Sequence, residues 1–322
     1  MLFTRFFRFF LLFIFTSILL TGCNKKLEVR VAYFPNITHA QGLFMKSEGM
    51  LERKLDNIAV KWIPFNAGPS EIEAMSAGQI DIGYVGPVPA VSGYVQSYGD
   101  IKIIAGASNG GSILVARRDA EINTATDLDG KNVAIPQFGN TQHLSLLSLL
   151  NSNRLAPASS GGSVNIVQAQ NADIVNLMDQ EHIDAALVPE PWGSILELKH
   201  NAKVVLDYNQ IDKRGIPSTA VVIARKDFLN KHRDIVEKFM EAHKEATLYI
   251  NENDVSDVIN TQIAEVTNSK LDVEILKSAF RRLEVTYEIP TNSIMDFAKI
   301  SLVEGFIPKF HGSDIIDDSF VK

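Results

Sequence analysis

Residues 77–87 read Ala-Gly-Gln-Ile-Asp-Ile-Gly-Tyr-Val-Gly-Pro, and residues 181–189 read Glu-His-Ile-Asp-Ala-Ala-Leu-Val-Pro. In both stretches a helical pattern ends before an Ile-Asp pair, an apolar strand follows, and the strand runs into a proline-containing loop. The two Ile-Asp pairs lie 103 residues apart, from Ile80 to Ile183. A unit of this kind that occurs twice predicts two similar α/β halves with mainly parallel sheets.

Two further pairs of segments support the duplication. Ile113–Asp119 (ILVARRD) resembles Val221–Asp227 (VVIARKD), and Val31–Asn36 resembles Val133–Pro136 more weakly. Any single pair has a plain alternative explanation, because all α/β units look alike. The similar offsets of the three pairs favour two lobes that share one plan.

These repeats predict the domain boundaries. Lobe one is expected to comprise residues 27–115 and 220–322, and lobe two residues 116–219. The strands Ile113–Asp119 and Val221–Asp227 are the expected crossovers between the lobes.

The first 22 residues have the pattern of a secretory signal peptide. Arg5 and Arg8 precede a twelve-residue run, Phe9–Leu20, that is broken only by Thr16 and Ser17. The run is shorter than the about 20 residues that span a bilayer. An ordinary leader of this kind places the folded part outside the cytoplasm, in the periplasm if the cell has two membranes.

The stretch that ends at Cys23 resembles the lipobox of bacterial lipoproteins, where the cysteine is lipidated and becomes the new N-terminus. Cys23 is the single cysteine of the chain, so an internal disulfide, a cysteine-based zinc site and a thiol redox pair are excluded. We expect residues 23–26 to form the lipidated terminus and a spacer that anchors the protein to a membrane of the cell envelope. The alternative is an ordinary signal peptide with a chance cysteine.

Composition and motifs argue against several functions. The 322 residues carry a formal net charge of −7, which does not suit a nucleic-acid-binding face. A nucleophile elbow, a phosphate loop, a dinucleotide fingerprint and a zinc-protease motif are absent, and the seven histidines do not cluster at metal spacing. We therefore expect no catalytic residue, no metal and no cofactor.

Candidate binding residues lie in loops that follow or precede apolar strands. Open α/β sheets bind ligands at the carboxyl ends of their strands, where helix N-termini offer free N–H groups to an anion. The candidates are Asn36, His39, Gly86, Pro87, Ser108, Asn109, Gly110, Gly111, Asn140, Thr141, Glu190 and Trp192.

Each loop also has a purely structural interpretation. Asn36 and Thr141 have the residue types of helix caps, Gly110-Gly111 of a tight turn, and Trp192 of a core residue, whereas Glu190 between two prolines is either aimed at a ligand or solvated. In the helix-rich C-terminal third, we expect Ile235, Phe239, Ala242, Ala246 and Ile250 to pack and His232 and His243 to face solvent.

Together these segments resemble the substrate-binding proteins of ABC importers for aliphatic sulfonates, nitrate and taurine, a family similar also to binding proteins for pyrimidine precursors of thiamine. The resemblance covers nearly all of residues 27–320. It rests on residues 31–40 (VAYFPNITHA), residues 77–83 with Gly78 and Asp81, and residues 188–192 with Glu190 and Trp192. It implies a type II periplasmic-binding-protein fold whose two lobes are joined by two β-strand crossovers and close over a small molecule.

The candidate loops depart from what a sulfonate site often has, because none of them contains an arginine. Glu190 would repel an anion unless it met a cationic or hydrogen-donating part of the ligand. This leaves room for an aminosulfonate or for a pyrimidine, on which Tyr33, Phe34, Phe138 and Trp192 are candidates to stack.

Three classes of function follow from the resemblance. The leading one is a monomeric binding component that delivers a small anion to the permease and ATPase subunits of an importer. A sensor subunit with the same ligand is an alternative that the sequence does not separate from it. An enzyme on the same fold is disfavoured, because the related pyrimidine synthases carry a cysteine-rich motif that this chain lacks.

Overall fold

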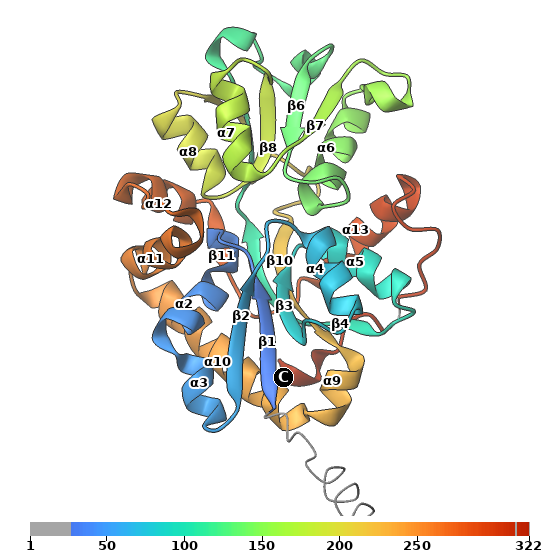
Figure 1. Ribbon diagram of the computed structural model, residues 1–322. Helices are drawn as coiled ribbons and strands as arrows, with labels where there is room; N and C mark the ends of the chain where they lie inside the picture. Colours follow the sequence, from blue (N-terminus) through green and yellow to red (C-terminus); the bar gives the residue numbers. More distant parts are fainter. Residues whose placement is uncertain (1–26, 313, 322) are drawn as a thin grey trace, which may run out of the picture.

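The computed structural model describes residues 27–312 and 314–321, which form two lobes joined by narrow connections (Figure 1). The predicted signal peptide, Cys23 and the spacer lie outside the described residues. None of the helices in the described part of the chain has the length and apolar character needed to cross a membrane.

Each lobe is built on one sheet. The strands of lobe one are β1 (Glu28–Tyr33), β2 (Ala59–Pro64), β3 (Ile82–Val85), β4 (Ile101–Gly110), β10 (Ser218–Arg225) and β11 (Leu283–Val285), in the spatial order β11-β4-β10-β3-β1-β2. Those of lobe two are β5 (Ser112–Ala116), β6 (Asn132–Ile135), β7 (Asn165–Gln168), β8 (Ala185–Pro189) and β9 (Lys203–Leu206), in the order β7-β6-β8-β5-β9. In both sheets three parallel strands are followed by an antiparallel one, β10 against β3 and β5 against β8.

The matching strand orders confirm the predicted duplication and the two-lobed α/β fold. The repeated residues also contact each other in the same way in both lobes. Asp81 pairs with Arg225, with Oδ1 3.2 Å from Nη2, and Asp184 pairs with Arg117 at 3.3 Å between the corresponding atoms. The repeated Ile-Asp and Ala-Arg segments therefore tie the third strand of each sheet to the antiparallel strand beside it.

The crossovers lie slightly earlier in the chain than predicted. The first is Gly110–Gly111, where β4 of lobe one continues into β5 of lobe two, and the second is the segment 207–217 between β9 and β10. Residues 112–115, assigned by the repeats to lobe one, belong to the sheet of lobe two, and Ser218 and Thr219 belong to lobe one. The repeats misplaced the boundaries for a simple reason. Each repeated strand is the first strand that the chain forms after it crosses into a lobe, so the crossover lies before that strand.

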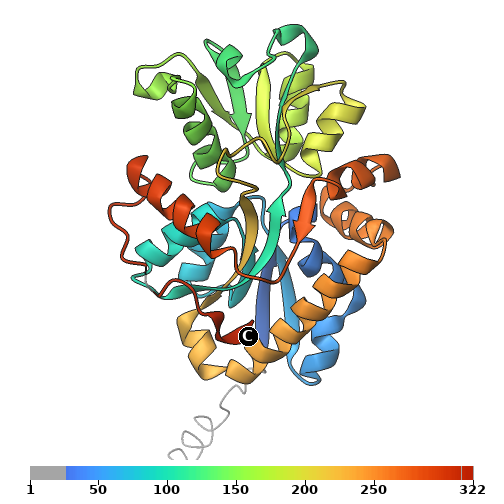
Figure 2. The ribbon, with the colours of Figure 1, turned by 180° about the vertical axis from the view of Figure 1, so that it is seen from behind.

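Helices cover both faces of each sheet (Figures 1 and 2). In lobe one, α2 (Ala40–Glu48), α3 (Met50–Leu55), α9 (Lys226–Lys231), α10 (Arg233–Glu252), α11 (Ser256–Thr267) and α12 (Val273–Phe280) share one core cluster, and α4 (Gly68–Ser76), α5 (Pro87–Gln96) and α13 (Thr291–Val303) share another. In lobe two, α6 (Thr141–Ser152) covers one face of the sheet, and α7 (Asn171–Asp179) and α8 (Trp192–Lys199) cover the other. The predicted stripe of α10, Ile235 to Ile250, is buried as expected.

The two lobes are closed on each other. Val88 of α5, Leu144 of α6 and Phe297 of α13 are buried in one small apolar cluster that joins the lobes. Closure therefore buries apolar surface outside the ligand site as well as within it.

His243 corrects an expectation. The helical pattern predicts a solvent-facing side chain, but His243 is fully buried in α10, its Nε2 lies 2.9 Å from the carbonyl oxygen of Gly106, and its Nδ1 lies 2.9 Å from the hydroxyl oxygen of Tyr84. Because a carbonyl only accepts, Nε2 carries the proton and Nδ1 accepts from Tyr84. Burial lowers the pKa of His243 to about 4, so the imidazole is neutral.

Replacing Tyr84 by Phe should lower the free energy of unfolding by about 1–3 kcal/mol, because the buried Nδ1 of His243 loses its donor. Urea denaturation followed by circular dichroism measures the change. Tyr98→Phe is the matched control, because Tyr98 is 94% exposed and its loss of a hydroxyl should leave stability unaltered. Equal stability of Tyr84→Phe and the wild type would contradict the assigned network.

Candidate ligand-binding site

A cavity lies between the lobes at the carboxyl ends of the parallel strands. Its volume is about 30 Å³, which is room for roughly two water molecules. It is lined by Phe34, Asn36, Thr38, His39, Asn66, Ala67, Gly68, Gly86, Pro89, Pro136, Asn140, Thr141, Gln142, Asn171, Pro189 and Thr219. Five predicted residues are among them: Asn36, His39, Gly86, Asn140 and Thr141.

Four helices from both lobes begin at this cavity. Gly68 opens α4, Gly86 is the N-cap of α5, Asn140 is the N-cap of α6, and Asn171 is the first residue of α7. Helix N-termini carry partial positive charge and unpaired N–H groups. The cavity therefore has the electrostatics of an anion site, with contributions from each lobe.

His39 is held in one neutral form. Its ring is 1% exposed and stacks on Phe34, and its Nδ1 accepts the backbone N–H of Phe34 at 3.0 Å. Since Nδ1 is an acceptor, the proton of the neutral ring resides on Nε2. Burial lowers the pKa of His39 to about 3, so this residue enters the site as a neutral hydrogen-bond donor.

Asn36 and Trp192 contact each other across the cleft. The indole Nε1 of Trp192, in lobe two, donates to Oδ1 of Asn36, in lobe one, at 2.9 Å. Asn36 lines the cavity, whereas Trp192 is outside the lining. Trp192 was expected to contact the ligand. It instead lies outside the lining and binds Asn36, which lines the cavity, so Trp192 is not a stacking platform.

Asn140 and Thr141 bring the first turn of α6 to the cavity. Oδ1 of Asn140 accepts the backbone N–H of His143 at 2.8 Å, so Asn140 caps the helix that Thr141 was expected to cap. Oγ1 of Thr141 is buried without a protein partner. A methyl group at Gly86 would overlap this hydroxyl, which shows how closely the two lobes approach.

Glu190 turns away from the cavity. It is fully buried and accepts from the backbone N–H of Ser194 at 2.9 Å, and it pairs with Arg282 at 3.1 Å. Burial raises the pKa of Glu190, and the hydrogen bond from Ser194 and the charge of Arg282 act in the opposite direction. Arg282, in lobe one, also pairs with Glu197 and Asp207, so this cluster fastens lobe two to lobe one beside the hinge.

The remaining candidates lie behind the cavity or at the hinge. Ser108 is buried and donates to the carbonyl oxygen of Thr38, a lining residue. Gly110 and Gly111 form the first crossover with φ of 71° and 69°, values that favour glycine. Pro87 is the first residue of α5 and is not in the lining.

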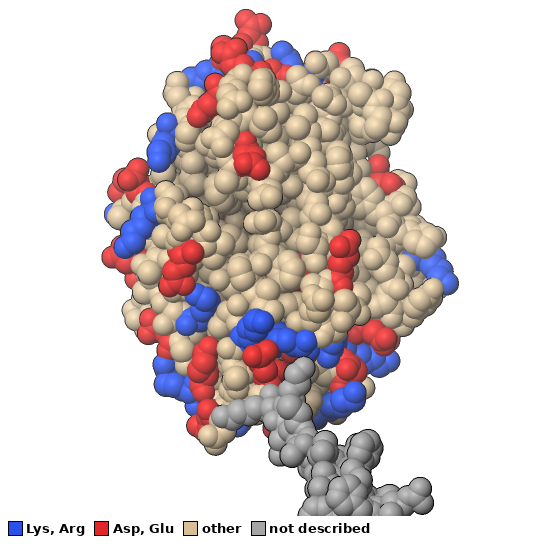
Figure 3. All heavy atoms as spheres, viewed as in Figure 1, with Lys and Arg blue, Asp and Glu red and all other residues tan. Residues whose placement is uncertain are grey.

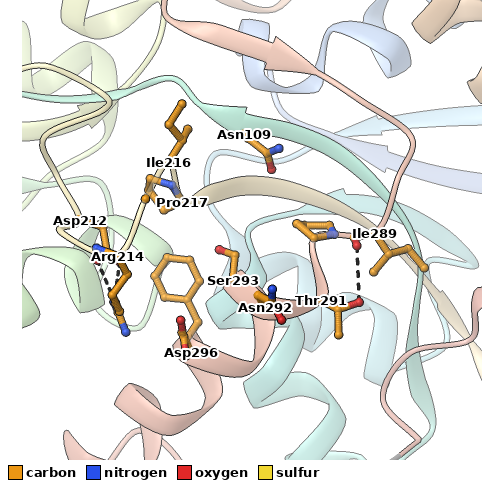
Figure 4. Close-up of a pocket in the computed structure, with 13 residues that line it drawn as sticks. Asn109, Asp212, Arg214, Ile216, Pro217, Ile289, Thr291, Asn292, Ser293 and Asp296 are labelled. Carbon is orange, nitrogen blue, oxygen red and sulfur yellow. Dashed lines mark hydrogen bonds and ion pairs between the residues drawn. The ribbon is translucent and has the colours of Figure 1, made fainter.

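Asn109 lies in a different cavity, of about 420 Å³, between the second crossover and the start of α13 (Figure 4). Arg214 is the cationic residue of that lining, and it is paired with Asp212. Asn292 and Ser293, at the start of α13, face the same space (Figure 4). The structure therefore separates Asn109 from the five residues that line the cleft.

Charged side chains stay away from the cleft. Among the described residues, those that line the cavity include no Lys, Arg, Asp or Glu. Lys and Arg lie mainly around the edges and the lower end of the face in Figure 3, whose middle is largely uncharged. The described lining therefore consists of uncharged side chains and the starts of four helices.

Sequence reasoning missed several lining residues, including Thr38, Asn66, Gly68, Gln142, Asn171 and Thr219. Asn66 and Asn171 each follow a strand, β2 and β7, and the rule that found the other loops applies to them equally. Of the aromatic residues offered for stacking, Phe34 lines the cavity but is stacked on His39, whereas Tyr33 is in the core and Phe138 is 49% exposed. Of these four candidates, Phe34 alone lines the cavity, and one of its faces is already stacked on His39.

A family model described as the NMT1-like family matches residues 22–264, about three quarters of the chain. The chain belongs to the NMT1-like family. Among the relatives of this NMT1-like chain is the taurine-binding periplasmic protein of Escherichia coli, 31% identical over 224 residues, which are 68% of the chain and 65% of that protein. A putative aliphatic sulfonates-binding protein of Bacillus subtilis is 23% identical over 94% of the chain and 90% of its own length.

Solved structures share the fold of this NMT1-like chain. The alkanesulfonate-binding protein SsuA of Xanthomonas axonopodis pv. citri, bound to MOPS, matches with a TM-score of 0.75 and 18% identity, over 91% of this chain and 98% of that chain. The periplasmic nitrate-binding protein NrtA of Synechocystis PCC 6803 matches with a TM-score of 0.70 and 13% identity, over 90% and 84% of the two chains. These likenesses confirm the periplasmic-binding-protein fold.

Replacing Gly86 by Ala should open the lobes. Gly86 has φ of −66° and ψ of 152°, which Ala adopts without strain, so the added methyl group acts through its overlap with Thr141. Overpacking of about 1–3 kcal/mol would lower the ratio of closed to open molecules roughly 5-fold to 150-fold, and small-angle X-ray scattering would report a larger radius of gyration.

Thr141→Ala provides the control in a double-mutant cycle. In the Thr141→Ala background, Gly86→Ala should change the scattering much less, because the overlapping hydroxyl is gone and only Cβ of residue 141 remains close, at 3.3 Å. An equal increase in both backgrounds would contradict a contact between the lobes at this point.

Proposed function

We propose that this chain captures a small anion of the sulfonate or nitrate type between its lobes as the substrate-binding component of an ABC importer. The observation that carries the proposal is the convergence of four helix N-termini, two from each lobe, on one cavity whose lining has no charged side chain. Such a cavity favours negative charge in the absence of an arginine.

The relatives support this proposal. The curated ones are named for binding taurine or aliphatic sulfonates and not for a reaction. A solved neighbour of similar fold is the ligand-binding component of an ABC-type import system from Staphylococcus aureus. Permease and ATPase subunits are the partners that this function requires.

The cavity also narrows the ligand. Taurine carries an ammonium group, and the lining offers no carboxylate to it, because Glu190 is engaged by Ser194 and Arg282. A pyrimidine would need an aromatic partner, and Phe34, the aromatic candidate in the lining, already has one face stacked on His39. The lining therefore favours a compact anion without a cationic part over both alternatives.

Isothermal titration calorimetry of the purified protein with nitrate, methanesulfonate, ethanesulfonate, taurine and a thiamine pyrimidine tests the proposal. We expect one or more of the three simple anions to bind at least roughly tenfold more tightly than taurine, a difference of about 1.4 kcal/mol. Tighter binding of the pyrimidine than of every anion would contradict the proposed ligand class.

We also propose that a lipid on Cys23 anchors this protein to a membrane. The sequence before Cys23 has the pattern of an export signal, and residues 24–27 separate it from β1. Lipidation at Cys23 would keep the folded lobes beside the permease, outside the cytoplasm.

Cys23→Ser should move the protein from the membrane fraction to the soluble envelope fraction, because a serine cannot form the thioether that carries the lipid. Cell fractionation with immunodetection measures the distribution, and Ser17→Ala within the leader serves as the control. Retention of Cys23→Ser in the membrane fraction would contradict the anchor.

A further inference from the structure

Three polar side chains of the cavity already have their acceptor atoms occupied by protein donors. Oδ1 of Asn36 accepts from the indole of Trp192, Oδ1 of Asn140 accepts from the backbone of His143, and Nδ1 of His39 accepts from the backbone of Phe34. Each side chain keeps its hydrogen-bond donor for the cavity, because its acceptor atom is turned toward a protein donor.

The orientations of these three groups are fixed. An amide or imidazole is often free to flip when its partner can both donate and accept. Here each partner is an indole or backbone N–H, which can only donate. The two amide oxygens and Nδ1 must therefore face their protein partners, and the amide NH₂ groups and Nε2–H are available elsewhere.

We infer that the cavity selects ligands that only accept hydrogen bonds, and that Trp192 is the positioning residue that sets this selectivity when the lobes close. The inference rests on the proposed function, because it concerns what the same cavity binds. Nitrate and the sulfonate group fit this description, whereas a ligand of equal size that carries N–H groups does not.

Trp192 is the partner of the three that acts across the cleft. The donors for Asn140 and His39 belong to the backbone of the same lobe and are present whether the lobes are open or closed. The donor for Asn36 comes from lobe two and crosses the cleft, so we expect opening of the lobes to break this bond. Closure therefore turns the amide of Asn36 so that its NH₂ group is the part left for the ligand.

Two other amides in the lining have no such constraint. Asn171 has a buried Oδ1 without a protein partner, and Gln142 donates to the hydroxyl of Ser112, a group that can also donate. Both amides can turn either the NH₂ group or the oxygen toward a ligand, so the selectivity rests on the three fixed groups and not on them. Thr141 likewise has an unpartnered hydroxyl that can donate.

A pair of probes of nearly equal shape measures this selectivity. Methanesulfonate has three acceptor oxygens, and methanesulfonamide replaces one of them by an NH₂ group that donates. We expect the wild type to prefer methanesulfonate by roughly 100-fold, because the sulfonamide places donors against donors and carries no charge. Isothermal titration calorimetry gives both dissociation constants.

Trp192→Phe removes the indole N–H and keeps an aromatic ring. Affinity for methanesulfonate should fall roughly tenfold, while affinity for methanesulfonamide should stay equal or rise, because the amide of Asn36 can now turn. A purely structural role of Trp192 would weaken both probes by the same factor. A ratio between the probes that equals the wild-type ratio would therefore overturn the inference.

Asn36→Asp tests the selectivity at the residue that accepts the hydrogen bond from Trp192. It keeps an oxygen for Trp192 but replaces the NH₂ group by a charged acceptor, so the order of the two probes should reverse. Asn151→Asp is the matched control, because Asn151 is exposed on α6, and the ratio should stay within about twofold of the wild type.

The outcomes separate the inference from the proposed function. Binding of neither methanesulfonate nor nitrate by the wild type would contradict the proposed function, and the inference with it. Tight binding of methanesulfonate with equal affinity for methanesulfonamide would leave the proposed function intact and overturn the inference alone.

Discussion

The pairing of one antiparallel strand with three parallel ones decides how the two lobes face each other. In lobe one β10 pairs with β3, and Val221 lies opposite Val85, the last residue of β3. In lobe two β5 pairs with β8, and Ser112 lies opposite Pro189, the last residue of β8. Because β10 and β5 are also the strands that the chain enters directly after each crossover, the carboxyl ends of β3 and β8 both lie at the hinge.

That constraint explains why helix N-termini from both lobes converge. A helix that follows a parallel strand begins at the carboxyl end of that strand, so two sheets that meet through these ends bring their helix starts together. Gly86 and Thr141 show how close the approach is, since the space between them leaves no room for a methyl group. A glycine at position 86 is thus required by the opposite lobe and not by its own backbone conformation.

The cavity uses neutral groups where a charged side chain would be the simpler partner for an anion. A buried arginine would have to lose its hydration, whereas helix N-termini and fixed amides are already oriented and carry no net charge. The chain does place a partly buried arginine nearby, but Arg282 is engaged by Glu190, Glu197 and Asp207. Pro189 lines the cavity, whereas the next residue, Glu190, belongs to the ion cluster. Adjacent residues of one loop therefore serve the candidate site and the contact between the lobes.

The sequence predicted the fold better than the roles of single residues. Repeats with alternating strand and helix patterns report topology, and the strand orders of the two sheets match as the repeats predict. They did not show that Asp81 and Asp184 pair with the arginines of the other repeat, because an ion pair between segments over 60 residues apart has no local pattern. The same limit applies to Glu190 and Trp192, whose loop was identified but whose partners, Arg282 and Asn36, come from the other lobe.

The candidate site depends on closure because its lining residues come from both lobes. A ligand shifts the equilibrium between open and closed lobes only by the difference between its affinities for the two forms. Here the closed form adds α6 and α7 of lobe two to α4 and α5 of lobe one, and it also fixes Asn36 through Trp192. The apolar contact of Val88, Leu144 and Phe297 stabilises the closed form without regard to the ligand. Discrimination must therefore come from the polar groups, because the apolar contact is the same for every ligand that permits closure.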